Sequence, residues 1–184
     1  MNTNSNHYGY LSITFHWLLV VALLALYFSG DYMVTLDYYD SWYHRAPELH
    51  KAFGIVIGIF MLLRFLWNKS QGCLKIESPG SMVNILAYAV HHLFYLLVLL
   101  LVITGYLVTT AKGQGIDVFG WFSVSATFAE NTEVSELSGK LHDLIAIIFM
   151  ILFITHTLAA LYHHFIKRDN TLKSMLSPEK KKAL

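Results

Sequence analysis

Four long apolar stretches dominate the chain, and none alternates between apolar and polar residues. They run from residues 11 to 30, 49 to 67, 82 to 110 and 137 to 166. A helix needs about 20 apolar residues to cross a bilayer, whereas a β-barrel would need more segments, shorter and alternating. The pattern therefore predicts an all-α fold, a four-helix transmembrane bundle that forms a single domain over residues 1–184.

The composition agrees with a membrane protein and excludes several other classes. Apolar residues make up 55% of the chain and charged residues 14%, compared with about 25% charged residues in an average soluble domain. A disordered chain would be polar and poor in aromatic residues. The net charge of +1 argues against a nucleic-acid partner. The one cysteine, Cys73, cannot form an internal disulfide, so the chain is no disulfide scaffold.

The basic residues predict the orientation of the bundle. Nine of them lie near the end of the second span, between it and the third span, or in the C-terminal tail: Arg64, Lys69, Lys75, Lys167, Arg168, Lys173, Lys180, Lys181 and Lys182. Only Arg45, Lys51, Lys112 and Lys140 lie on the other side. The positive-inside rule then places both termini in the cytoplasm. Acidic residues divide the opposite way, so the outer side is acidic overall.

Histidines are the main candidates for chemistry, because ionisable residues inside a membrane are rare and usually functional. There are ten, and most lie in or at the ends of the predicted spans. His142 and His156 are fourteen residues apart, which is nearly four helical turns, so both lie on one helix face about 21 Å apart. Two ligands at that separation suit two cofactors stacked across the membrane.

Depth below the outer end of each span pairs these histidines with others on different helices. At about 1.5 Å per residue, two lie about 3 Å below the edge, two at about 22–24 Å, and two at about 31–35 Å. The resulting pairs are His50 with His142, His16 with His156, and His91 with His163. Each level thus offers two imidazoles from different helices.

Two facing imidazoles at each of two levels suit axial ligation of two b-type haem irons. The chain has no Cys-x-x-Cys-His motif for c-type attachment, and zinc or copper would want more ligands at one level. His50, Gly54 and Gly58 share a helix face and leave room for a flat macrocycle, although such spacing is also typical of helix packing. Arg64, on the same face, either pairs with a haem propionate or anchors the span at the cytoplasmic surface.

Several segments resemble the bacterial cytochrome b561 family. They are residues 12–18 (Ser-Ile-Thr-Phe-His-Trp-Leu), 48–54 (Glu-Leu-His-Lys-Ala-Phe-Gly), 140–143 (Lys-Leu-His-Asp) and 163–172. The match covers nearly the whole chain in order. It implies a four-helix di-haem cytochrome of the bacterial inner membrane. By position, it implies that His50 and His142 ligate the outer haem iron, and His16 and His156 the inner one, the same pairs that depth gives.

The resemblance also implies an activity. A well-known family member is a superoxide oxidase, an oxidoreductase that passes an electron from superoxide on the outer side to ubiquinone. A quinone pocket near the inner face would use His91 and His163 as hydrogen-bonding and proton-donating groups. The alternative is that His91 replaces His16 or His156 as an iron ligand.

Three basic residues lie beside the outer histidines in the sequence: Arg45, Lys51 and Lys140. Although the outer side is acidic, these residues predict a small basic funnel that attracts the superoxide anion. Salt screens the distant acidic charges, so the nearby basic charges dominate the local potential. The alternative is that they only flank helix ends.

Two other functions remain open. A relay subunit would accept electrons from a peripheral dehydrogenase or hydrogenase and pass them to quinone, with the loop of residues 112–138 as the docking surface for that redox protein. A bundle without a redox role would transport a metal ion or protons. The pairing of histidines by depth disfavours transport, which needs polar groups along one continuous path.

Overall fold

A computed structural model of the chain describes residues 10–70, 82–126 and 129–176. It contains four helices that are long and apolar enough to cross a membrane. They are α1 (Tyr10–Met33), α2 (Arg45–Ser70), α3 (Met82–Thr110) and α4 (Thr132–Tyr162). The predicted all-α transmembrane fold is confirmed.

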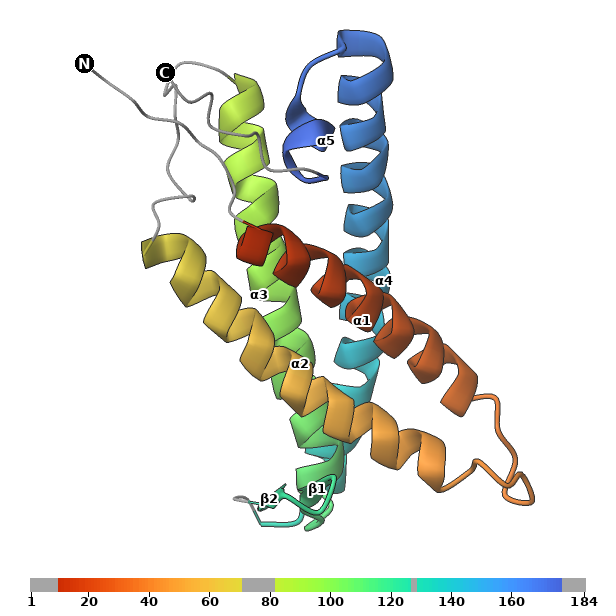
Figure 1. Ribbon diagram of the computed structural model, residues 1–184. Helices are drawn as coiled ribbons and strands as arrows, with labels where there is room; N and C mark the ends of the chain where they lie inside the picture. Colours follow the sequence, from red (N-terminus) through yellow and green to blue (C-terminus); the bar gives the residue numbers. More distant parts are fainter. Residues whose placement is uncertain (1–9, 71–81, 127–128, 177–184) are drawn as a thin grey trace.

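The four helices form two antiparallel pairs (Figure 1). Helices α3 and α4 lie side by side along their length, while α1 and α2 pack on each other and cross the first pair obliquely. Helix α2 also packs on α3. The central cluster of buried residues, Leu97, Val98 and Phe149, lies between α3 and α4. Large apolar side chains elsewhere on the helices are exposed, as expected for surfaces that face lipid rather than water.

The end of the bundle that carries the α1–α2 and α3–α4 connections holds a short hairpin of β1 (Ile116–Val118) and β2 (Phe122–Val124). Its turn places Phe119 at φ 54° and Gly120 at φ 70°, the two positive φ values that tight hairpin turns favour. Val118 is fully buried, and the Phe119 ring packs on Phe53 of α2 at 4.9 Å between centroids. The predicted loop of residues 112–138 is therefore partly folded, and α4 begins within it at Thr132.

At the opposite end, α4 continues as a π-helical turn, η1 (His163–Lys167), which stops at Arg168 in the left-handed conformation. The short helix α5 (Thr171–Ser174) then folds back. The indole Nε1 of Trp17 on α1 donates a hydrogen bond of 2.8 Å to the Met175 carbonyl. This contact ties the start of α1 to the end of the described chain.

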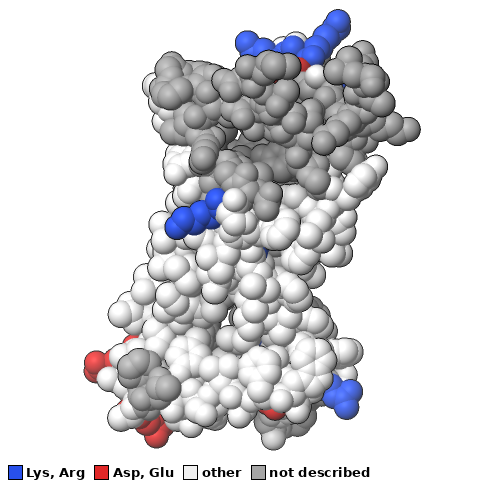
Figure 2. Space-filling model, turned by 60° about the vertical axis from the view of Figure 1, so that its left-hand side comes forward, with Lys and Arg blue, Asp and Glu red and all other residues white. Residues whose placement is uncertain are grey.

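The charged side chains separate along the bundle (Figure 2). Lysine and arginine gather at the end that carries η1 and α5, while most visible aspartate and glutamate lie at the hairpin end, where a small basic patch also occurs. One further basic group lies on the left, well below the top end, and the rest of the middle is almost free of charge on this face. The distribution matches the sequence-based division into a basic and an acidic side.

Candidate cofactor sites

The first site is formed by His50 of α2 and His142 of α4, near the hairpin end. Their ring centroids are 6.3 Å apart, with an angle of 76° between the ring planes. Since a metal–imidazole bond is about 2.0–2.1 Å long, two imidazoles on opposite sides of one ion have ring centres about 6 Å apart. The predicted pair is thus brought together at the spacing that a shared iron requires.

Each ring of this pair is held by a hydroxyl group from a neighbouring helix. His50 Nδ1 lies 3.0 Å from Ser29 Oγ, and His142 Nδ1 lies 3.0 Å from Thr104 Oγ1. Both hydroxyls already donate their proton to a helix carbonyl, Ser29 to Leu26 and Thr104 to Leu100. The imidazoles must therefore donate from Nδ1, which leaves each Nε2 with a free lone pair for a metal ion.

Two glycines make room for the same rings. A Cβ atom on Gly30 would lie 3.1 Å from Cε1 of His50, and one on Gly105 would lie 3.1 Å from Cε1 of His142. Neither residue is among the glycines that the sequence predicts to make room for a macrocycle. Of those that it does predict, Gly54 borders open space, as a macrocycle requires. Gly58 instead packs closely on α3, where an added Cβ would come within 2.7 Å of Val102.

We expect the substitution Gly105→Ala to weaken cofactor binding at this site by about tenfold, the lower end of the range for a disturbed support of a metal ligand. The added methyl would displace the His142 ring by several tenths of an ångström. Titration of the purified apoprotein with haem measures the effect. Gly139→Ala is the control, because its Cβ would meet Val108 only at 4.0 Å. Equal haem affinity in both variants would contradict the expectation.

A second polar cluster lies deeper in the bundle and contains three histidines and an arginine. The rings of His91 on α3 and His156 on α4 are 5.7 Å apart, and His91 Nδ1 donates to the Ala87 carbonyl at 2.7 Å. Arg64 on α2 reaches α1, where Nη1 donates to the Ser12 carbonyl at 3.2 Å and Nη2 lies 3.3 Å from His16 Nδ1. The structure thus places His16, His91 and His156 around Arg64, one imidazole more than a single iron needs.

Arg64 does not act only as an anchor at the membrane surface. Its guanidinium is part-buried and joins α1 to α2 through the contacts with Ser12 and His16. A part-buried guanidinium beside histidines that could bind a metal suits a carboxylate such as a propionate. The position is compatible with that role.

His91 and His163, predicted together as a quinone pocket, have separate partners. His91 lies beside His156, whereas His163 begins the π-turn and its Nδ1 lies 2.5 Å from Asp169 Oδ2. The hydrogen bond from His163, with further bonds from Thr171, lowers the pKa of Asp169 to about 2. The carboxylate is therefore ionised at neutral pH and fixes the orientation of the imidazole.

The donor set fits haem iron better than a bare metal ion. In the parts of the chain that the structure describes, no three His, Cys, Asp or Glu side chains gather as a metal-ion site. Zinc and copper sites need such convergence, whereas haem iron takes only two axial ligands from the protein. The facing rings of His50 and His142 and the open space at Gly54 meet this requirement.

The three predicted basic residues all lie at the acidic end. Arg45 is the first residue of α2, Lys51 follows His50 directly, and Lys140 lies two residues before His142 on α4. Arg45 and Lys140 are exposed and Lys51 is half-buried. Within the described residues, no carboxylate forms an ion pair with any of them. Their charges are therefore available to an incoming anion.

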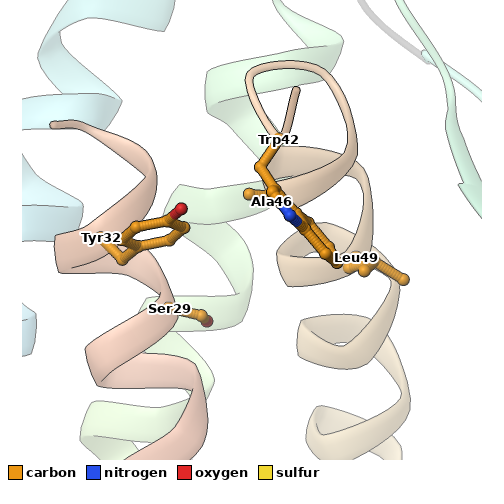
Figure 3. Close-up of a pocket in the computed structure, with 5 residues that line it drawn as sticks. All are labelled: Ser29, Tyr32, Trp42, Ala46 and Leu49. Atoms are coloured by element: carbon orange, nitrogen blue, oxygen red, sulfur yellow. The ribbon is translucent and has the colours of Figure 1, made fainter. Parts of the chain in front are cut away.

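A small apolar pocket lies between α1 and α2 close to the outer pair (Figure 3). Its volume is about 250 Å³, and its lining residues are Ser29, Tyr32, Trp42, Ala46 and Leu49. Ser29 and Tyr32 project from α1 toward the Trp42 side chain, which lies beside Ala46 and Leu49. Ser29 lines this pocket, and its hydroxyl group is also the hydrogen-bond partner of His50.

Comparison with known proteins agrees with the geometry. Residues 7–178 match the family described as prokaryotic cytochrome b561. The chain is 44% identical over 172 residues to cytochrome b561 homolog 2 of Escherichia coli (strain K12), which covers 92% of this chain and 90% of that protein. It is 29% identical over 176 residues to the probable superoxide oxidase CybB of Yersinia pestis, which covers 95% and 97%.

The family match spans the four helices and both histidine clusters. Members of this family bind haem b and carry electrons. The apolar helices and the family together indicate a multi-pass protein of the bacterial inner membrane. The chain therefore belongs to the prokaryotic cytochrome b561 family.

Proposed function

We propose that this chain is a superoxide:ubiquinone oxidoreductase that binds two haem b groups and moves electrons across the bilayer. The observation that supports this proposal is the facing pair of His50 and His142, together with a second histidine cluster that includes His156, fourteen residues further along α4. Bound haem iron supplies reversible one-electron chemistry. Each superoxide gives up one electron and leaves as O₂, and ubiquinone takes up two electrons and two protons to become ubiquinol.

His50 and His142 are the proposed ligands of the outer haem, and His16 and His156 those of the inner haem. A macrocycle between two ligands needs space between the helices that carry them. Helices α2 and α4, which hold the outer pair, are not among the closely packed pairs of the described chain, and neither are α1 and α4. His91 lies on α3, which packs tightly on α4. This difference in spacing favours His16 over His91 as the partner of His156. Ligation by His16 Nε2 requires that Arg64 turns from His16 Nδ1 to a propionate, because a ring whose Nδ1 accepts a hydrogen bond carries its proton on Nε2.

At the acidic end, Arg45, Lys51 and Lys140 attract and orient superoxide beside the outer pair. A positive local potential is needed there because the substrate is an anion and its surroundings carry a net negative charge. The basic end then faces the cytoplasm, with both termini on that side. The funnel and the orientation thus support each other.

At the basic end, Arg64 holds a propionate. His91 and His163 contact the quinone from two separate positions, one beside His156 and the other beside Asp169. Asp169 accepts the hydrogen bond from Nδ1 of His163, so Nε2 is the ring atom that exchanges a proton with a quinone oxygen. With the basic end toward the cytoplasm, ubiquinone would take up its protons on that side.

The experiment is a spectrum followed by a turnover assay. The purified protein is expected to contain two haem b per chain by pyridine haemochrome. Superoxide from an enzyme that reduces O₂ should reduce these haems in aerated buffer and should reduce a soluble ubiquinone analogue catalytically, and superoxide dismutase should abolish both reactions. A well-folded preparation that binds no haem when haem is supplied would overturn the proposal. Haems that quinol reduces but superoxide does not would refute the superoxide step alone.

The second candidate is a relay subunit for a peripheral redox protein. It is favoured by the connection between α1 and α2, where Tyr38 and Tyr39 are exposed among acidic residues. Exposed aromatic and charged side chains are typical of a contact surface. A stoichiometric partner that co-purifies in mild detergent and reduces the haems would favour this function. Full superoxide activity of the isolated chain would count against it.

A further inference from the structure

The two hydroxyl groups behind the outer histidines form a matched arrangement. Ser29 Oγ and Thr104 Oγ1 each accept from an imidazole Nδ1 at 3.0 Å. They come from α1 and α3, whereas the histidines come from α2 and α4. All four helices thus contribute one residue at this level.

The direction of each hydrogen bond follows from the hydroxyl proton. Thr104 donates its proton to the Leu100 carbonyl at 2.7 Å, with Leu101 at 3.2 Å, and Ser29 donates to Leu26 at 3.0 Å. Each hydroxyl oxygen therefore has only lone pairs left for the imidazole. An acceptor at Nδ1 makes Nε2 a better electron donor to a metal ion.

Besides Thr104, His142 also has the Leu101 carbonyl of α3 as a hydrogen-bond partner. The deeper cluster is held by other groups. His91 donates to a backbone carbonyl, and the group near His16 Nδ1 is a guanidinium, which can only donate. Side-chain hydroxyl acceptors among the described residues occur only on His50 and His142. A substitution of Ser29 or Thr104 can therefore alter the hydrogen bonding of the outer histidines without altering that of the deeper cluster.

We propose that Ser29 and Thr104 are positioning residues that fix the tautomer of His50 and His142 and lower the reduction potential of the haem that these histidines bind. The inference rests on the proposed function. A stronger electron donor stabilises the oxidised iron more than the reduced iron, so an acceptor at Nδ1 lowers the potential. Neither hydroxyl touches the iron, and both act through the imidazole.

The experiment is a potentiometric titration of Ser29→Ala, Thr104→Val and the double variant, followed by visible absorption. Each single variant is expected to shift the ratio of reduced to oxidised outer haem about tenfold toward reduced, which equals about 59 mV for one electron. The double variant should shift it further, since the two residues act on different ligands. The couple that disappears in His50→Ala identifies the outer haem.

The controls separate this effect from general disturbance. Ser29→Thr and Thr104→Ser keep a hydroxyl and should retain the wild-type potential. Thr110→Val removes a hydroxyl that makes the same kind of bond on α3, to the Tyr106 carbonyl, and should shift neither couple. Thr104 is also buried at 7% exposure, so valine, with the same shape, should fill its site.

Two results would overturn the inference. One is an outer couple that stays unchanged in both single variants while two haems remain bound. The other is an equal shift of both couples, which indicates a general change of the bundle. A wild-type protein without haem would instead remove the proposed function, so the two failures are distinguishable.

Discussion

The substitution His16→Ala is expected to reduce the haem content from two per chain to one, whereas His91→Ala should leave two. The reason is that a macrocycle between two ligands needs space between the helices that carry them. His16 and His156 lie on α1 and α4, which are not closely packed in the described chain, while His91 lies on α3, packed against α4. Pyridine haemochrome analysis against protein concentration measures the count. The outer haem retained in His16→Ala reports that the bundle is still folded.

A matched control is His92→Ala. The His92 ring lies against Tyr88, and its Nδ1 donates to the Tyr88 carbonyl, so the substitution removes an imidazole of α3 outside the proposed ligand set. It should leave both haems bound. If His91→Ala loses one haem and His16→Ala keeps both, then His91 and His156, whose rings are 5.7 Å apart, form the inner pair and our assignment is wrong.

The double substitution Lys51→Glu with Lys140→Glu is expected to slow reduction of the outer haem by superoxide about tenfold at low salt, near the lower end of the range for electrostatic steering. Reversal of two charges turns the attraction for the anion into repulsion. The rate difference should shrink at high salt, because the screening length falls to about 3 Å at 1 M. Stopped-flow absorption after mixing with superoxide measures the rate.

The control reverses two charges at the other end of the bundle, with Lys167→Glu and Lys173→Glu. It changes the net charge equally but lies beyond α4, with Lys167 on η1 and Lys173 on α5. The rate with superoxide should stay at the wild-type value. A wild-type rate in the Lys51 and Lys140 variant, or an equal loss in both double variants, would refute the funnel.

Sequence alone determined the membrane spans and predicted that two histidines lie at the same depth near the outer side. The spans follow from length and hydropathy, because about 20 apolar residues as helix match the thickness of the bilayer core. His50 with His142 follows from depth, since rise per residue is fixed in a helix. The tertiary structure then brought these two rings to 6.3 Å.

The inner level could not be resolved in the same way. Depths counted along the sequence depend on span edges that are uncertain by about one helical turn, and they give no lateral position. They therefore paired His91 with His163, but the structure places His91 beside His156 and His163 beside Asp169. Which imidazoles meet depends on how the helices cross, and α1 and α2 cross the other pair obliquely.

Only the tertiary structure revealed Ser29, Thr104, Gly30 and Gly105. Each is a small residue within an apolar span, and such residues also serve ordinary helix packing, so the sequence offers no signal that singles them out. Their role depends on the rotation of one helix against its neighbour, which places a hydroxyl or a missing Cβ against an imidazole. The periodicity of a span defines its faces, whereas packing between spans decides what each face meets.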